Sequence, residues 1–202
     1  MKLYYAPGAC SLASHIACEE GGVPCTYVKV DLRAKKLEDG GDYLAINPKG
    51  AVPALALDSG GVLTENAVVL QYIADQAPGT ALAPAPGTFE RYRLAEWLNY
   101  IATEIHKGWG PLWNAKSPEE AKDAARKSLA TRFDYVAKRL ASMPWLLGDG
   151  FTVADAYLFV MLNWSGILKF DLAPWPVLTA YHKRIAERPA VQRALRAEGL
   201  LH

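Results

Sequence analysis

Leu3-Tyr4-Tyr5-Ala6-Pro7-Gly8-Ala9-Cys10-Ser11 is the stretch that decides how the first part of this chain folds. Its apolar and aromatic start is typical of a short β-strand, its centre of a turn, and the segment from Leu12 to Glu20 of a helix. Cys10 is therefore predicted at a helix N-terminus, where unpaired N–H groups and the helix dipole lower the pKa of a thiol. A small buried hydrophobic side chain is the alternative, and this stretch alone leaves both interpretations open.

The composition excludes several classes of partner. The 202 residues are 51% hydrophobic and 21% charged, which suits a compact protein with a sizeable core. The 22 Lys and Arg against 21 Asp and Glu lack the basic excess that binds nucleic-acid phosphates. The longest apolar run, residues 156–162, is far shorter than the roughly 20 residues that cross a bilayer. The apolar stretch at the N-terminus breaks too early to be a secretion signal, so we expect a cytoplasmic location. From the charge balance and the short apolar runs we expect neither nucleic acid nor a membrane as a partner.

The three cysteines are Cys10, Cys18 and Cys25. Their number is odd, and their spacing matches neither a metal site nor a CxxC pair, so no metal is expected. We interpret Cys18 and Cys25 as ordinary core residues.

The sequence pattern changes near residue 80, where proline and glycine become frequent. Before this point, strand-like runs at 2–5, 26–30, 54–57 and 62–63 alternate with helical segments at 11–20 and 66–75. After it, helical periodicity dominates, with helices expected at 89–106, from Ser117 onward, at 152–168 and at 177–187. We therefore predict an α/β domain at 1–78, a linker at 79–87 and an all-α domain at 88–202.

Two of these helices carry start signals. Ser117-Pro118-Glu119-Glu120 combines a capping serine, a proline at the first helical position and a glutamate three residues after the cap. Thr152 and Asp155 repeat the capping pattern. We interpret both of these as structural residues.

The helix expected at 89–106 has a polar stripe opposite its apolar one. Asn99, Thr103 and His106 lie within roughly 60° of one another at about 100° per residue. Taken alone, such a stripe on an amphipathic helix is more often a solvated surface. Short amide, hydroxyl and imidazole groups nevertheless favour directed hydrogen bonds to a ligand.

Taken together, ordered landmarks along nearly the whole chain resemble a cytosolic glutathione S-transferase. They are the strand ending at Tyr5, the Pro7–Ser11 turn, Asn47-Pro48-Lys49-Gly50-Ala51-Val52-Pro53, Leu63-Thr64-Glu65-Asn66, and Thr152-Val153-Ala154-Asp155. Cys10 and His106 point to the bacterial beta class of that family. The resemblance implies a thioredoxin-like N-terminal domain, a helical C-terminal domain, and a homodimer.

The resemblance also implies a glutathione site. A cis Val52-Pro53 bond, which general X–Pro statistics alone do not favour, would let the Val52 backbone pair with the cysteinyl part of glutathione. Glu65 and Asn66 would hold the γ-glutamyl end, although the family more often has serine at the second position. Lys35 would approach the glycyl carboxylate, unless it is merely one of a solvated basic cluster. The polar stripe of the helical domain, together with Glu104, is assigned to the same site.

The chemistry expected of this site is activation of the glutathione thiol. A thiol of pKa about 8.5 is only about 3% ionised at pH 7, and lowering the pKa by two units requires about 2.7 kcal/mol. A helix dipole supplies at most about 2 kcal/mol, so hydrogen bonds must contribute. The candidate donors are the Cys10 N–H, the Ser11 hydroxyl, His106 and, as a distant charge, Lys107. Tyr5 is a weaker candidate, because in the beta class cysteine replaces the activating tyrosine of other classes.

We therefore expect a detoxifying transferase that conjugates glutathione to small hydrophobic electrophiles. The electrophile pocket should lie between the domains, lined by Tyr5, Ala9, residues 109–113 and Trp164, although core packing explains each aromatic equally well. Two alternatives are a thiol-disulfide oxidoreductase acting through a Cys10 mixed disulfide, and a non-catalytic protein that binds apolar ligands.

Overall fold

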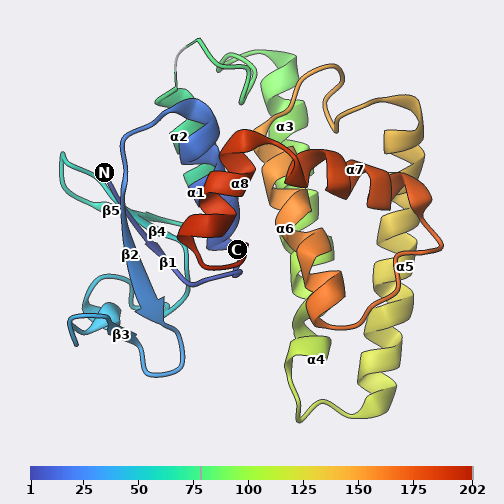
Figure 1. Ribbon diagram of the computed structural model, residues 1–202, viewed down its shortest axis with the longest axis horizontal. Helices are drawn as coiled ribbons and strands as arrows, with labels where there is room; N and C mark the ends of the chain where they lie inside the picture. The colour runs from blue at the N-terminus through green and yellow to red at the C-terminus, as the bar shows by residue number, and fades with distance from the viewer. Residues whose placement is uncertain (78, 202) are drawn as a thin grey trace. The chain divides into compact units, whose positions relative to one another are not determined.

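The computed structural model describes residues 1–77 and 79–201, which form two compact units (Figure 1). Unit 1 comprises Met1–Ala83 with Glu187–His202, and unit 2 comprises Pro84–Ala186. This division differs from the domains expected at 1–78 and 88–202, because it groups the end of the chain with unit 1. Pro78 and His202, which bound those domains, lie outside the described residues. The fold class is confirmed: a thioredoxin-like α/β unit and a helical unit.

Unit 1 contains one mixed β-sheet in the order β3-β2-β1-β4-β5. Its strands are β1 (Lys2–Tyr5), β2 (Thr26–Asp31), β3 (Lys36–Leu37), β4 (Ala54–Ala56) and β5 (Val62–Thr64). β1 and β2 are parallel and the other neighbours are antiparallel. The expected strands are present, and the additional strand β3 is too short to show an alternating pattern.

Both faces of this sheet are covered. Leu3 and Leu55 are paired and fully buried, while their neighbours Tyr4 and Ala54 belong to a second apolar cluster with Tyr43. Tyr43 opens the short 3₁₀ helix η1 (Tyr43–Ala45). Helices α1 (Ser11–Gly21) and α2 (Asn66–Asp75) pack side by side against the sheet (Figure 1). Alternate strand residues therefore serve two separate cores.

The last helix, α8 (Pro189–Ala197), packs on α1. It buries small apolar residues against α1, and Arg188 donates to Glu20 at 2.6 and 2.8 Å. Arg193 pairs with Glu19 at 2.7 Å. These contacts explain why the end of the chain belongs to unit 1.

Unit 2 is helical. Its elements are α3 (Phe89–Tyr100), η2 (Ile101–His106), η3 (Lys107–Trp109), α4 (Gly110–Trp113), α5 (Glu119–Ser142), α6 (Val153–Ile167) and α7 (Pro176–Ala186). Helix α6 is buried on nearly all sides, as its continuous apolar sequence requires. At its start, Thr152 and Asp155 form the expected capping box.

Two expectations about helix geometry are wrong. α5 begins at Glu119 with Pro118 at its N-cap, so Ser117 is not the capping residue. The segment 89–106 is not one α-helix, because η2 is wound as a π-helix. No helix within residues 1–77 and 79–201 is long and apolar enough to cross a membrane.

Candidate active site

The Cys10 side chain lies where β1 turns into α1. Cys10 is the N-cap residue of α1, and it is 8% exposed. Its Sγ donates a hydrogen bond to the Val52 carbonyl at 3.1 Å. The thiol predicted to be reactive is thus held at the helix N-terminus against the backbone that was predicted to pair with glutathione.

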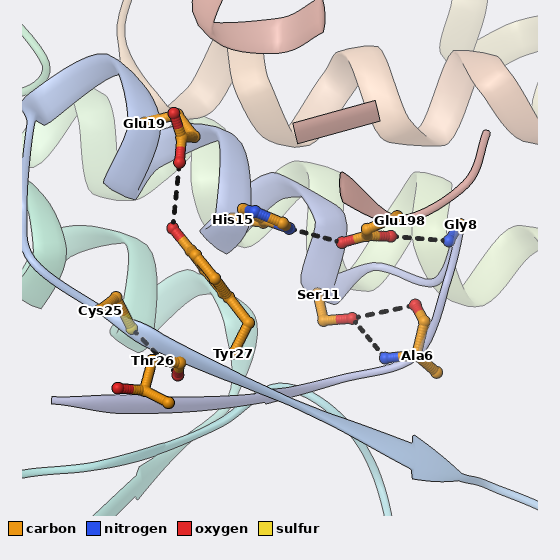
Figure 2. A network of polar contacts seen from close by, with 9 residues as sticks. All are labelled: Ala6, Gly8, Ser11, His15, Glu19, Cys25, Thr26, Tyr27 and Glu198. Carbon is orange, nitrogen blue, oxygen red and sulfur yellow. Dashed lines mark hydrogen bonds and ion pairs between the residues drawn. The ribbon is translucent and has the colours of Figure 1, made fainter. Parts of the chain in front are cut away.

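The turn before Cys10 is stabilised by buried polar groups (Figure 2). The Ser11 hydroxyl accepts from the Ala6 N–H at 3.2 Å and donates to the Ala6 carbonyl at 3.4 Å. The Gly8 N–H donates to Glu198 Oε2 at 2.9 Å. Gly8 has φ of +70°, a conformation that favours glycine. The Ser11 hydroxyl therefore stabilises the conformation of the turn.

Glu198 is a site-supporting residue that sequence reasoning missed. Its other oxygen, Oε1, lies 3.0 Å from His15 Nδ1, and both side chains are buried (Figure 2). The ring of Tyr27 stacks on His15 with centroids 3.8 Å apart. Tyr5, nearby, has a pKa raised above its usual value, mainly by burial and then by the Glu198 charge. No sequence pattern marked a glutamate from the chain's end as part of this turn.

The loop before β4 carries a cis peptide bond between Val52 and Pro53, as the resemblance implied. The preceding carbonyls are fixed by side chains. Lys35 Nζ donates to the Gly50 carbonyl at 2.7 Å. The Ala51 carbonyl accepts from Asn47 Nδ2 and the Tyr43 hydroxyl, each at 2.7 Å. Lys35 thus lies against this loop rather than in a freely solvated cluster.

The start of α2 brings two more predicted residues to this region. Asn66 is buried; its Nδ2 donates to the Cys10 carbonyl at 3.1 Å, and its Oδ1 accepts from the Ser14 hydroxyl at 2.7 Å. Glu65 is exposed, and its φ of +67° is unusual for a residue other than glycine. Its carboxylate pairs with Lys49 Nζ at 2.6 Å. Asn66 therefore links the N-termini of α1 and α2.

Two residues of the polar stripe, Thr103 and His106, lie in the π-helical segment η2, and the third, Asn99, lies near the end of α3. π-helical turns are rare in proteins, but those that do occur are frequently found at functional sites. His106 Nδ1 lies 2.6 Å from the Tyr157 hydroxyl, and its ring meets Trp164 edge-on with centroids 5.0 Å apart. Trp113 contacts the same Trp164 ring at 5.3 Å. Tyr157, which sequence reasoning missed, thus fixes the orientation of the imidazole.

The other predicted residues of unit 2 differ in their surroundings. Glu104 is paired with Arg132, with Nη2 and Oε2 2.9 Å apart. Asn99, Thr103 and Lys107 are exposed, and the Thr103 hydroxyl donates to the Asn99 carbonyl. Among the residues that the structure describes, no group of three or more His, Cys, Asp and Glu could hold a metal ion.

The chain matches known proteins along its whole length. Residues 8–76 match the family model of the glutathione S-transferase N-terminal domain, and residues 100–189 match that of the C-terminal domain. "Glutathione S-transferase GstA" of Escherichia coli O157:H7 is 50% identical over 99% of this chain and 100% of its own. The chain belongs to the glutathione S-transferase family. It is an enzyme whose co-substrate is glutathione.

Solved structures of glutathione S-transferases agree with this assignment. A ternary complex of BphK, a bacterial glutathione S-transferase, is 56% identical with a TM-score of 0.97, and covers 99% of this chain and 100% of its own. A sphingomonad glutathione S-transferase complexed with glutathione is 50% identical with a TM-score of 0.96, over 99% of this chain and 100% of its own. The beta-class enzyme of Sphingomonas chungbukensis has the same identity and TM-score over 100% of both chains. The enzyme is therefore a beta-class glutathione S-transferase.

Proposed function

We propose that this glutathione S-transferase conjugates glutathione to small hydrophobic electrophiles, and that the glutathione thiol is activated at the N-terminus of α1. One observation carries this proposal. The Cys10 thiol bonds to the Val52 carbonyl, and the Cys10 carbonyl bonds to Asn66. Two predicted glutathione-binding positions, Val52 and Asn66, therefore lie within hydrogen-bonding distance of a third, Cys10, from which they are far apart in sequence.

Each part of glutathione has a proposed partner in unit 1. The Val52 backbone pairs with the cysteinyl unit like an added strand. The γ-glutamyl carboxylate lies at the start of α2 near Asn66, while its ammonium pairs with Glu65 and replaces Lys49 there. Lys35 contributes a positive charge for the glycyl carboxylate, from its position beside Gly50.

Activation of the sulfur requires more than the helix dipole, so directed donors must contribute. We assign the main roles to the Cys10 N–H and to His106, with Lys107 as a longer-range charge. Ser11 contributes less than expected from sequence, because its hydroxyl already bonds to Ala6. Burial raises the pKa of Tyr5, so its hydroxyl stays protonated and can donate a hydrogen bond to the sulfur.

The remaining residues of the polar stripe have smaller proposed roles. Asn99 is exposed and can donate to bound glutathione, whereas the exposed Thr103 hydroxyl already donates to the Asn99 carbonyl and can accept a hydrogen bond. Glu104 is already paired with Arg132, so we expect it to orient its surroundings more than to bind the ligand directly.

The test is the glutathione-dependent rate of conjugation to an activated chloro-aromatic, with enzyme-free and glutathione-free controls. The wild-type rate should exceed both controls. His106→Asn should lower kcat/KM by roughly 10²-fold or more, as expected for loss of a preorganised donor. His182→Asn is the matched control, because His182 bonds to Asn163 elsewhere in unit 2. A wild-type rate at background would refute the transferase proposal.

Disulfide exchange at Cys10 is a second candidate activity, favoured by the position of this thiol at a helix N-terminus. The Cys10 thiolate attacks the glutathione sulfur of a mixed disulfide and releases the other thiol. A second glutathione then attacks the Cys10–glutathione disulfide, which restores Cys10 and forms glutathione disulfide. Cys10→Ser should abolish this exchange while glutathione binding stays measurable; retained exchange would refute it.

A homodimer in the cytoplasm is the proposed setting. α3 and α5 expose aromatic residues, and the ring of exposed Tyr135 on α5 contacts Trp97 and Tyr100 of α3. Such exposed aromatic surface suits a second copy of the chain. Light scattering should give a dimer mass that Tyr135→Glu reduces; a monomeric wild type would refute it.

A further inference from the structure

The end of α1 and the start of β2 bring Cys18 and Cys25 together. α1 ends at Gly21, and Gly22 follows in the left-handed conformation, with φ of +59°. The Val23 N–H donates to the Cys18 carbonyl at 2.9 Å. The chain therefore reverses its direction within one helical turn of Cys18 and then enters β2.

Contacts of Tyr27 show which side of the returning chain faces α1. Tyr27 lies two residues after Cys25, so in an extended chain the two side chains point to the same side. The Tyr27 ring stacks on His15 at 3.8 Å, and its hydroxyl donates to Glu19 at 3.5 Å (Figure 2). On α1, His15, Cys18 and Glu19 lie on one face, because residues three and four apart are neighbours. Cys25 therefore faces the turn of α1 that carries Cys18.

The two thiols differ in exposure and in ionisation. Cys18 is 1% exposed, whereas Cys25 is half-buried and its Sγ lies 3.7 Å from the Thr26 carbonyl. The thiols are close enough to share a hydrogen bond, which lowers the pKa of Cys25 and, together with burial, raises the pKa of Cys18. The more accessible sulfur is thus also the one whose pKa is lowered, and the buried sulfur is the one whose pKa is raised. This is the division between an attacking thiol and a resolving thiol.

We propose that Cys25 and Cys18 form a thiol pair that reacts with glutathione disulfide, independently of Cys10. The Cys25 thiolate attacks one sulfur of glutathione disulfide, forming a Cys25–glutathione mixed disulfide and releasing one glutathione thiolate. Cys18 then attacks the Cys25 sulfur, which forms the Cys18–Cys25 disulfide and breaks the bond to glutathione; the Cys18 proton passes to the departing sulfur, and the second glutathione leaves as its thiol. Two protein thiols are oxidised and one glutathione disulfide is reduced to two glutathione molecules.

The proposal is tested by mass spectrometry on the full-length Cys10→Ser protein, which removes the other reactive thiol. The folded protein is incubated with glutathione disulfide, alkylated and digested. No lysine or arginine lies between Leu3 and Val28, so trypsin leaves Cys18 and Cys25 in one peptide. Additional cleavage after Glu19 or Glu20 separates them, and a disulfide then appears as two linked peptides.

The expected product is the linked pair, with a mass lower by two hydrogens than the reduced form. Adding Cys18→Ala should stop the reaction at glutathionylated Cys25, and adding Cys25→Ala should leave Cys18 unmodified. In the reduced, folded Cys10→Ser protein that keeps both cysteines, alkylation should modify Cys25 at least about tenfold faster than Cys18. Equal alkylation rates would overturn the proposal. So would a Cys25 that stays fully reduced under conditions in which glutathione disulfide exchanges readily with free glutathione. Because Cys10 is absent from all these proteins, failure here leaves the proposed transferase function untouched.

Discussion

Replacing Asn66 with alanine tests whether the link between α1 and α2 stabilises the glutathione-binding unit. The change deprives the Ser14 hydroxyl of its buried acceptor, at a cost of about 1–2 kcal/mol, and removes the hydrogen bond itself, worth about 1 kcal/mol. The Cys10 carbonyl loses less, because it still accepts from the Ala13 N–H at 3.1 Å. We expect the free energy of unfolding of unit 1 to fall by about 2–3 kcal/mol. With an m-value near 3 kcal/mol per molar urea, the midpoint falls by roughly 1 M.

The choice of signal matters for this experiment. All six tryptophans, at 97, 109, 113, 145, 164 and 175, lie in unit 2, so their fluorescence does not report directly on unit 1. Far-ultraviolet circular dichroism should be followed as well, at one fixed protein concentration because a dimer's stability depends on it. Asn99→Ala, the same change at an exposed position, is the control and should alter stability by less than about 0.5 kcal/mol. An Asn66→Ala protein as stable as this control would refute the reasoning.

Three further predictions follow from buried and exposed charges. Asp155→Ala removes a fully buried carboxylate that accepts from four donors, so the melting temperature should fall by about 6–12 °C for a loss of about 3 kcal/mol; a fall below 2 °C would contradict this. Lys49→Ala breaks an exposed ion pair and should change the free energy of unfolding by less than about 0.5 kcal/mol in urea titrations; a larger loss would show that the pair is not solvent-screened. Burial lowers the pKa of His182, so the unfolded chain takes up its proton at a higher pH than the folded protein does. Stability should therefore decline as the pH falls below about 6.5, and His182→Asn should flatten this decline; identical pH profiles would rule out His182 as a cause.

Strong local signals made much of the fold predictable. The strand at 2–5 and the helix at 66–75 are found at the expected residues, because clear apolar patterns lie between turn residues. α8 was missed, since it spans only nine residues and so offers little more than two turns of helical periodicity. The π turn η2 was also missed, because inserting one residue into a helix changes the winding but hardly changes the polar and apolar composition of the segment.

Residues of the candidate site could be singled out from the sequence where a local signal marks them. Cys10 and Val52 could be singled out because a turn, a helix start and a proline mark them in the sequence. Glu198 and Tyr157 could not, because their importance comes from tertiary contacts with Gly8 and His106. Sequence also treated Cys18 as a separate core residue, whereas the chain reversal after α1 sets it beside a second thiol.

The return of α8 to α1 has a consequence for how this protein is made. Unit 1 consists of both ends of the chain, so a ribosome has synthesised all of unit 2 before the last part of unit 1 emerges. Until then, Glu198 is missing from the turn that carries Cys10, and the arginines that bind Glu19 and Glu20 are absent. A nascent chain that does not yet include Glu198 therefore carries an incompletely supported turn around Cys10, and this turn gains its full set of contacts only when residues 187–198 have been added.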